Sequence, residues 1–191
     1  MSVISFEAAA SQRGLSRPAA NDGEAPVASV HAFSAQTAGL RSLTAASHRA
    51  ALALMRADGL TDVAHTITHI WPHLLGVDMT AIAIAAANEG MMSSAYGTQR
   101  LPGARVAQWG DSAGRWISRD ADVADLFGVR PRDLGTALLL PVTLESGLGF
   151  GVVGFADVRC RSDMDGTDTE ALDFLVTGVS RMLTRCLDAT I

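Results

Sequence analysis

The sequence contains no lysine, and all fifteen of its basic residues are arginines. Schiff-base catalysis by lysine and nucleotide binding through a P-loop lysine are therefore excluded. The formal net charge is −5, and the arginines are scattered among aspartates instead of forming a concentrated basic face. Because nucleic-acid binding requires such a face, we expect no nucleic-acid partner.

Cysteine is also scarce, and Cys160 and Cys186 are the two examples in 191 residues. Two cysteines without a C-x-x-C pairing form neither a disulfide framework nor a typical zinc site, so we expect reduced thiols. The longest apolar run, residues 80–87, is far shorter than the roughly 20 residues of a membrane-spanning helix. The start of the chain also lacks the basic segment of a signal peptide. These absences predict a cytoplasmic protein without a membrane partner.

Composition divides the chain at about residue 37. Residues 1–37 are rich in alanine, serine, glycine and proline and show no sustained periodicity, which predicts a mobile tail. The rest carries helical and strand patterns, in a chain that is 48% hydrophobic and 18% charged, as soluble globular proteins are. We therefore expect one folded domain over residues 38–191, long enough to bury a substantial core.

The order of these patterns predicts an α+β fold. An antiparallel sheet with the N- and C-terminal helices packed on one face is the simplest arrangement. Helices are expected over residues 37–56, over 61–75 with Thr61 as N-cap and Gly76 as the end, and from Thr167 as N-cap to the end of the chain. Strands are expected over 77–87, 91–97, 135–142 and 149–158, and a long connection over 98–133 holds one short helix between Asp120 and Gly128.

Two of the expected strands carry small residues. In residues 77–87, Ile82 and Ile84 lie on one face and alanines on the other, which predicts close approach of a helix to the alanine side. Gly149, Gly151 and Gly154 have the G-x-G-x-x-G spacing of a dinucleotide site. They lie inside a strand, however, where glycine usually marks a close backbone contact. We expect no cofactor.

The stretch VAHTITHIWPHLLG, residues 63–76, carries three histidines at four-residue intervals. On a helical wheel, His65, His69 and His73 lie nearly opposite an apolar arc formed by Leu60, Val63, Ile67, Ile70, Trp71 and Leu74. The glutamate of an H-E-x-x-H zinc helix is absent, and the outer histidines are too far apart for one ion to hold all three. The pattern favours a stripe that faces solvent or a second copy over a metal site.

The connection over residues 98–133 carries the best candidates for a binding site. Trp109 and Trp116 are able to wall a pocket, and arginines such as Arg130 and Arg132 are able to meet an anionic group. The alternative is a surface loop in which the interleaved aspartates neutralise those arginines.

Cys160 is the candidate for redox chemistry. Arg159 and Arg161 flank it, and neighbouring positive charge favours the reactive thiolate. The alternative is an inert thiol.

The segments ADLFGVRPRDLGTALLLPVTLESGLGFGVVGFADV and DGTDTEALDFL resemble the bacterial domain-of-unknown-function 484 family, a GAF-like group. In that family a short helix ending in L-F-G precedes a strand of the form S-x-A-L-x-P-L. A glycine-flanked strand follows, and G-T-D-F-L opens the last helix. The matching positions are Leu126 to Gly128, Ala137 to Pro141, Gly149 to Gly154, Gly166 with Thr167, and Asp173 to Leu175. The resemblance covers roughly residues 38–187.

This resemblance implies a GAF fold with a ligand pocket under residues 98–133, on the sheet face away from the terminal helices. It also implies dimerisation through those helices, which suits Phe174, since that residue lies opposite the core stripe of the last helix. Known GAF chemistries require an N-K-F-D-E signature for cyclic nucleotides, a cysteine followed by histidine for bilins, or clustered cysteines for methionine-sulfoxide reduction. The sequence contains none of these patterns.

Together these observations predict a non-catalytic sensory or regulatory domain, homodimeric, that binds an unidentified small molecule or a protein partner. The expected pocket lining is Tyr96, Trp109, Trp116, Phe127, Arg130 and Thr136. One alternative is a purely structural homodimeric interaction module without a ligand, and another is a thiol redox sensor acting through Cys160. A cavity above roughly 300 Å³ behind the two tryptophans would favour the ligand over the interaction module.

Overall fold

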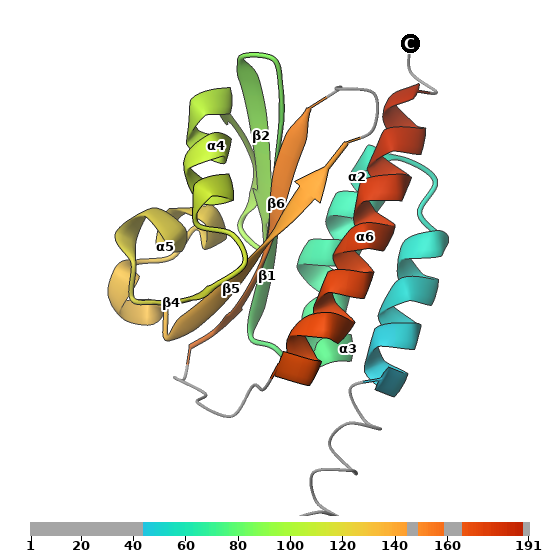
Figure 1. The fold of residues 1–191 in the computed structure, drawn as a ribbon, viewed down its shortest axis with the longest axis horizontal. Coiled ribbons are helices and arrows are strands. Elements are labelled where there is room, and N and C mark those ends of the chain that lie inside the picture. Colours follow the sequence, from blue (N-terminus) through green and yellow to red (C-terminus); the bar gives the residue numbers. More distant parts are fainter. Residues whose placement is uncertain (1–43, 145–148, 159–165, 189–191) are drawn as a thin grey trace, which may run out of the picture. The chain divides into compact units, whose positions relative to one another are not determined.

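The chain folds around a six-stranded antiparallel sheet with the strand order β3-β2-β1-β6-β5-β4 (Figure 1). The computed structural model describes residues 44–144, 149–158 and 166–188. The strands are β1 (Met79–Ala86), β2 (Glu89–Ser94), β3 (Gly97–Pro102), β4 (Trp116–Ser118), β5 (Thr136–Thr143) and β6 (Phe150–Asp157). The helical elements are a first helix over residues 44–55, α2 (Leu60–His65), the π-helical turn η1 (Thr66–Ile70), α3 (Trp71–Leu75), α4 (Gly103–Asp111), α5 (Ala121–Phe127), the 3-10 turn η2 (Pro131–Asp133) and α6 (Gly166–Asp188).

Helices cover both faces of this sheet. The first helix, the continuous helix from α2 to α3, and α6 lie on one face and are called the helical layer here, whereas α4 and α5 lie on the other (Figure 1). The predicted α+β class, with the N- and C-terminal helices on one face of an antiparallel sheet, is confirmed. Of the helices that the structure describes, none is both long and apolar enough to cross a membrane. The tail predicted for residues 1–37 lies outside the described residues.

Strand β1 explains why the two faces carry different layers. Its isoleucines, Ile82 and Ile84, pack into the core of the helical layer. Its short side chains, Ala81, Ala83 and Ala85, pack into the core beneath α4 and α5. This side of the sheet is called the alanine face below. The alternation predicted from the sequence is therefore confirmed, and α4 lies directly on β1 as the small side chains allow.

Strands β5 and β6 form the predicted hairpin and pair from Thr136 opposite Asp157 to Thr143 opposite Phe150. Gly154 of β6 lies opposite Ala81 and belongs to the alanine face. Gly151 and Gly154 therefore lie within a strand, as predicted, whereas Gly149 comes just before it.

The second predicted helix is continuous through α2, η1 and α3. Its N-cap is Gly59, so the prediction of Thr61 as N-cap is wrong. The Asp62 carboxylate in the first turn accepts a hydrogen bond from the Asp58 N–H at 3.2 Å, and a negative charge there also suits the helix dipole. Gly76 ends the helix in the left-handed conformation, as predicted.

Pro72 leaves one backbone acceptor without a donor beside the π-helical turn of this helix. In a π-helical register the Ile67 carbonyl would accept a hydrogen bond from residue 72, and proline has no N–H to donate. The Thr80 hydroxyl of β1 donates to that carbonyl instead, in a buried hydrogen bond. The π-helical turn also changes the angular spacing assumed by the helical wheel, so Ile70 leaves the predicted apolar arc and is exposed.

Residues 98–133 contain more regular structure than the sequence predicts. The expected short helix is α5, in which the Asp120 carboxylate accepts a hydrogen bond from the Val123 N–H at 3.0 Å and Gly128 forms the C-cap. The additional elements are β3, α4, β4 and the short turn η2. The sequence does not reveal β3 because an edge strand exposed on both faces shows no alternation of apolar and polar residues.

The last helix, α6, begins at Gly166, so Thr167 lies in its first turn and is not the N-cap. Five apolar residues on one side of this helix are fully buried, namely Leu172, Leu175, Val176, Val179 and Leu183. Phe174 on the opposite side is exposed, as predicted.

Trp71 joins the helical layer to the sheet. Its Nε1–H donates to the Ala50 carbonyl of the first helix at 3.1 Å, and its ring stacks on Phe155 of β6 with 6.2 Å between ring centres. The indole is fully buried, so its single polar atom needs this carbonyl as a partner. One side chain therefore holds the first helix, α3 and β6 together.

We predict that Thr80→Val lowers the free energy of unfolding by about 1–3 kcal/mol, because the buried Ile67 carbonyl then loses its donor. Urea denaturation measures the change. Thr143→Val is the matched control, since Thr143 is exposed on β5, and its effect should stay below about 0.5 kcal/mol. Equal effects of the two substitutions would show that the Thr80 hydroxyl does not replace the missing proline N–H.

Candidate functional site

An open hollow of about 460 Å³ lies beside Trp109, between β3, α4 and the turn that follows α5. Its lining consists of Met92, Gln99, Leu101, Arg105, Trp109, Asp125, Gly128, Val129 and Arg130. It lies on the side of the sheet where the family resemblance implies a ligand pocket. The question for function is how much of the predicted pocket lining meets there.

Trp109 fills space between α4 and the sheet more than it walls a cavity. The residue is only 2% exposed, and its Nε1–H donates to the Asp122 carbonyl at 2.6 Å. The Arg105 guanidinium lies over the ring at 5.2 Å from its centre, within the range of a cation–π contact. The tryptophan is thus fixed by packing, by a hydrogen bond and by a charged neighbour.

Two carboxylates hold that guanidinium in place. Arg105 pairs with Asp122 at 2.9 Å and with Asp125 at 2.7 Å, so α4 is tied to α5. The hydrogen bond with Asp122 is the main cause that raises the pKa of Arg105 above its ordinary value, and the charges of both aspartates add to it. Sequence reasoning missed Arg105, although its position one helical turn before Trp109 is the spacing that brings two side chains together.

Four of the six residues predicted to line a pocket gather on this side. Trp109 and Arg130 line the hollow, and the Tyr96 ring packs against Gly128 at its border. Phe127 is nearby but buried between α5 and the sheet. These residues form a core with a shallow surface hollow above it.

The other two predicted residues point to the opposite face. Trp116 lies directly opposite Leu138, and paired residues of antiparallel strands share a face. Leu138 belongs to the core of the helical layer, so Trp116 is on that side as well. Thr136 is two residues before Leu138 on β5, so its side chain lies on the same face. Its buried hydroxyl has no hydrogen-bond partner among the described residues. The hollow therefore does not extend to these two positions.

Aspartates also neutralise the arginines after α5. Arg130 pairs with Asp133 at 2.9 Å, and Arg132 approaches the same carboxylate at 3.8 Å. These geometries match the alternative in which interleaved aspartates satisfy the arginines of this connection. An incoming anion would have to compete with carboxylates already in place.

The three histidines lie on the exposed side of the second helix, as predicted. The rings of His65 and His69 stack with 4.7 Å between centres, and Nδ1 of His69 is 2.7 Å from the Thr68 hydroxyl. That hydroxyl donates to the Ala64 carbonyl, so His69 acts as the donor in the second bond. Within the described part of the chain, no three histidine, cysteine, aspartate or glutamate side chains gather closely enough to hold a metal ion.

Of the two cysteines, the structure describes Cys186. Cys160, the predicted redox residue, lies outside the described residues. Cys186 lies on α6, partly buried against the core of the helical layer.

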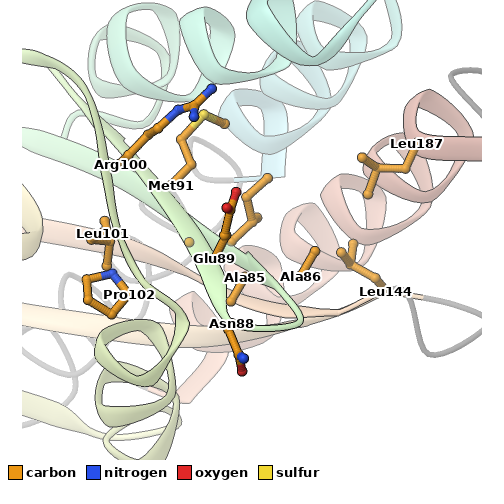
Figure 2. A pocket seen from close by; sticks show the side chains of 12 residues that line it. Ala85, Ala86, Asn88, Glu89, Met91, Arg100, Leu101, Pro102, Leu144 and Leu187 are labelled. Atoms are coloured by element: carbon orange, nitrogen blue, oxygen red, sulfur yellow. The ribbon is translucent and has the colours of Figure 1, made fainter.

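A second hollow of about 630 Å³ lies where the β1–β2 hairpin, the end of β3 and the end of α6 approach one another (Figure 2). Leu144 and Leu187 form one wall, and Met91 with Arg100 lies across from them (Figure 2). The sequence gives no sign of this site, because residues 84–102 meet there with Leu144 and Leu187, which lie far along the chain.

A third hollow of about 550 Å³ lies on the outer surface of the helical layer, between the first helix and α2 with η1. Its apolar lining includes Leu52, Ile70 and Leu74, and His65 lies at the same surface. Leu52 is 54% exposed, and the neighbouring Met55 on the first helix is 70% exposed. This apolar region is called the helical groove below.

Three solved structures of other proteins resemble this fold. The GAF domain of a phosphoenolpyruvate-protein phosphotransferase from Coxiella burnetii has a TM-score of 0.60 and 14% identity, covering 79% of this chain and 98% of its own. The corresponding GAF domain from Acinetobacter has a TM-score of 0.55 and 13% identity, covering 75% and 93%. A free methionine-R-sulfoxide reductase from Neisseria meningitidis, solved with its substrate, has a TM-score of 0.51 and 14% identity, covering 76% and 89%.

At this level of identity the likeness shows the fold alone, and the chain has a GAF-like fold. No protein-family model matches the sequence. No curated protein matches it either. The narrower resemblance to the domain-of-unknown-function 484 family therefore stays a prediction.

We predict that Trp109→Ala lowers the free energy of unfolding by about 3–5 kcal/mol, because it empties a close-packed position. Trp116→Ala is the matched control: that tryptophan is 38% exposed on the short strand β4, so a clearly smaller loss is expected. Denaturant titration of both variants gives the comparison. A Trp109 variant as stable as the wild type would mean that the indole is a pocket wall and not part of the core.

Proposed function

We propose that this chain is a non-catalytic regulatory domain that acts through a protein interface on its helical layer, with a second copy of itself as the partner. The observation that carries the proposal is the apolar surface of the helical groove, lined by Leu52, Ile70 and Leu74, together with the exposed Met55 one turn after Leu52 on the first helix. Contiguous apolar side chains at a surface are typical of interaction sites. A regulatory role agrees with the GAF-like fold, and dimerisation agrees with the dimeric arrangement implied by the sequence resemblance.

The construction of the opposite side supports an interaction module over a small-molecule receptor. Trp109 and Phe127 occupy the space between the sheet and the helices α4 and α5, where the resemblance implies a ligand pocket. The carboxylates at that surface are engaged with arginines and do not stand free for acid–base chemistry. This arrangement favours a non-catalytic role.

Polar groups around the helical groove suit contact with a second copy. Arg49 of the first helix, Arg56 just after that helix and Asp62 of α2 line it together with the apolar residues. When two identical surfaces meet about a two-fold axis, each presents both signs of charge to the other. The apolar side chains then supply the buried centre, and the charged ones supply the rim.

We predict that the wild-type chain sediments at twice its chain mass of 19.9 kDa and that the double variant Leu52→Glu, Met55→Glu sediments at the mass of one chain. Buried carboxylates without partners disfavour the interface strongly. Analytical ultracentrifugation measures both masses. Phe150→Glu is the control, since Phe150 is an exposed apolar residue on β6, far along the chain from the helical groove, and this variant should stay dimeric. Retention of the dimer by the double variant would contradict the proposal.

A second candidate function is small-molecule binding in the hollow beside Trp109. Its volume of about 460 Å³ favours this function, since it lies within the size range of ligand sites. Fluorine NMR of protein labelled with 5-fluorotryptophan tests it against a fragment library. A ligand in the hollow should shift the Trp109 signal and leave that of Trp71, which is buried on the other face, unchanged.

The thiol redox sensor remains a further alternative. It requires the Cys160 thiol to react with a disulfide reagent at neutral pH much faster than Cys186 does. Mass spectrometry of the modified peptides compares the two rates.

A further inference from the structure

Strand β3 forms one edge of the sheet, and none of the described residues adds a strand beyond it. Five of its six residues are exposed, and the strand is about as long as an ordinary strand in a globular protein. Proteins usually blunt such an edge with short strands, charges or proline, since its backbone groups are otherwise free to pair with another chain. The opposite edge, β4, is only three residues long.

The register of the β2–β3 hairpin shows which backbone groups of β3 point outward. The N–H of Gly103 donates to the Asn88 carbonyl at 2.8 Å, which marks these two residues as a hydrogen-bonded pair. Hydrogen-bonded and non-hydrogen-bonded pairs alternate along an antiparallel ladder. Leu101 and Gln99 therefore bond to β2, whereas the N–H and C=O groups of Thr98 and Arg100 point away from the sheet.

Pro102 agrees with this assignment of inward and outward backbone groups. Pro102 has the same strand phase as Arg100, so the N–H that it lacks would have pointed outward and not into the ladder. It ends the open edge on one side, and the turn at Tyr96 ends it on the other. The open edge is thus a short strip with two outward donors and the matching acceptors.

We propose that this strip binds an extended segment of a partner protein by strand addition, and that the segment carries an acidic residue opposite Arg100 and apolar residues at the alternate positions. Main-chain hydrogen bonds to Thr98 and Arg100 would supply the affinity, as in other strand-addition complexes. Their alternate neighbours, Gln99 and Leu101, lie on the other face of the strand. This surface is independent of the helical groove, so the two proposals stand or fall separately.

Charge complementarity argues for the acidic residue. Arg100 is exposed and has no ion-pair partner among the described residues, in contrast to Arg105 and Arg130. An oppositely charged residue directly across an antiparallel pair stabilises the pairing. Arg100 also lines the hollow of Figure 2 with the apolar Met91, and Gln99 lines the hollow beside Trp109. Leu101 lines both hollows. Side chains on both faces of an added strand therefore have open space beside them.

A second copy fits this edge less well. Self-pairing centred on Arg100 places two arginines opposite each other, which is repulsive. Self-pairing centred on Gln99 places each Arg100 opposite a Thr98, but leaves the two arginines diagonal neighbours at about 7–8 Å on one face. Pairing limited to this strip also covers less surface than a stable dimer needs. A partner segment with the opposite charge avoids this repulsion, and a single extended segment does not have to hold two folded chains together.

Amide hydrogen exchange with two synthetic peptides tests the proposal on the full chain. The probes are acetyl-SVEVEVS-amide and its basic counterpart acetyl-SVKVKVS-amide. Without peptide, the amides of Thr98 and Arg100 should exchange rapidly while those of Gln99 and Leu101 are protected. The acidic peptide should slow exchange at Thr98 and Arg100 and bind about fivefold more tightly than the basic one.

Two variants separate strand addition from non-specific charge attraction. Arg100→Glu should reverse the preference between the two peptides. Thr98→Pro removes an outward N–H without breaking the β2–β3 ladder, so it should keep the fold and abolish protection by either peptide. If Thr98→Pro fails to fold, the assigned phase of the edge is wrong and the proposal is overturned.

Two further results would overturn the proposal. The first is protection of the Thr98 and Arg100 amides in the chain without peptide, which would mean that another segment or a second copy already occupies the edge. The second is unchanged exchange at both amides when either peptide is present in excess.

Discussion

The contact between Phe127 and Gly154 controls the whole side of the molecule that carries α4 and α5. A β-carbon at position 154 would lie 2.6 Å from Cζ of Phe127, so the ring reaches its place only because the strand has no side chain there. On the neighbouring strand β1, the alanine face also has short side chains, so the helices approach the sheet closely there too. With α5 close to the sheet, Trp109 closes the remaining space from α4 and leaves only a shallow hollow at the surface. Small residues in the central strands thus decide that this side is a core and not a deep pocket.

In the helical layer, by contrast, large side chains fix the helices against the sheet. Other large apolar side chains of the same helices stay exposed. Trp71 bonds to the Ala50 carbonyl and stacks on Phe155, which fixes the first helix and α3 against β6. The π-helical turn beside Pro72 then rotates Ile70 outward, where it joins Leu52 at the helical groove. This apolar surface is the basis for the proposed interface.

The sequence predicts the parts of this structure whose side chains have a consistent periodicity or a local cap. The alternation in β1, the glycine-containing hairpin of β5 and β6, and the cap from Asp120 to Gly128 are read correctly because each signal lies within one element. Strand β3 and the hollows are not predictable in this way, since an edge strand has no buried face and a hollow combines distant segments. The same reason explains the candidate site. Trp116 and Thr136 have suitable chemistry, but only the strand register shows that they lie on the other face.

The most direct test of this account is native mass spectrometry of the chain purified gently from its own host, followed by denaturation to release anything bound. The account holds that the helical layer makes an interface and that the side under α4 and α5 is already filled by Trp109 and Phe127. It predicts two chains per particle and no retained small molecule. A single chain at micromolar concentration would contradict the interface. A discrete additional mass released on denaturation would contradict the filled side and identify the class of ligand.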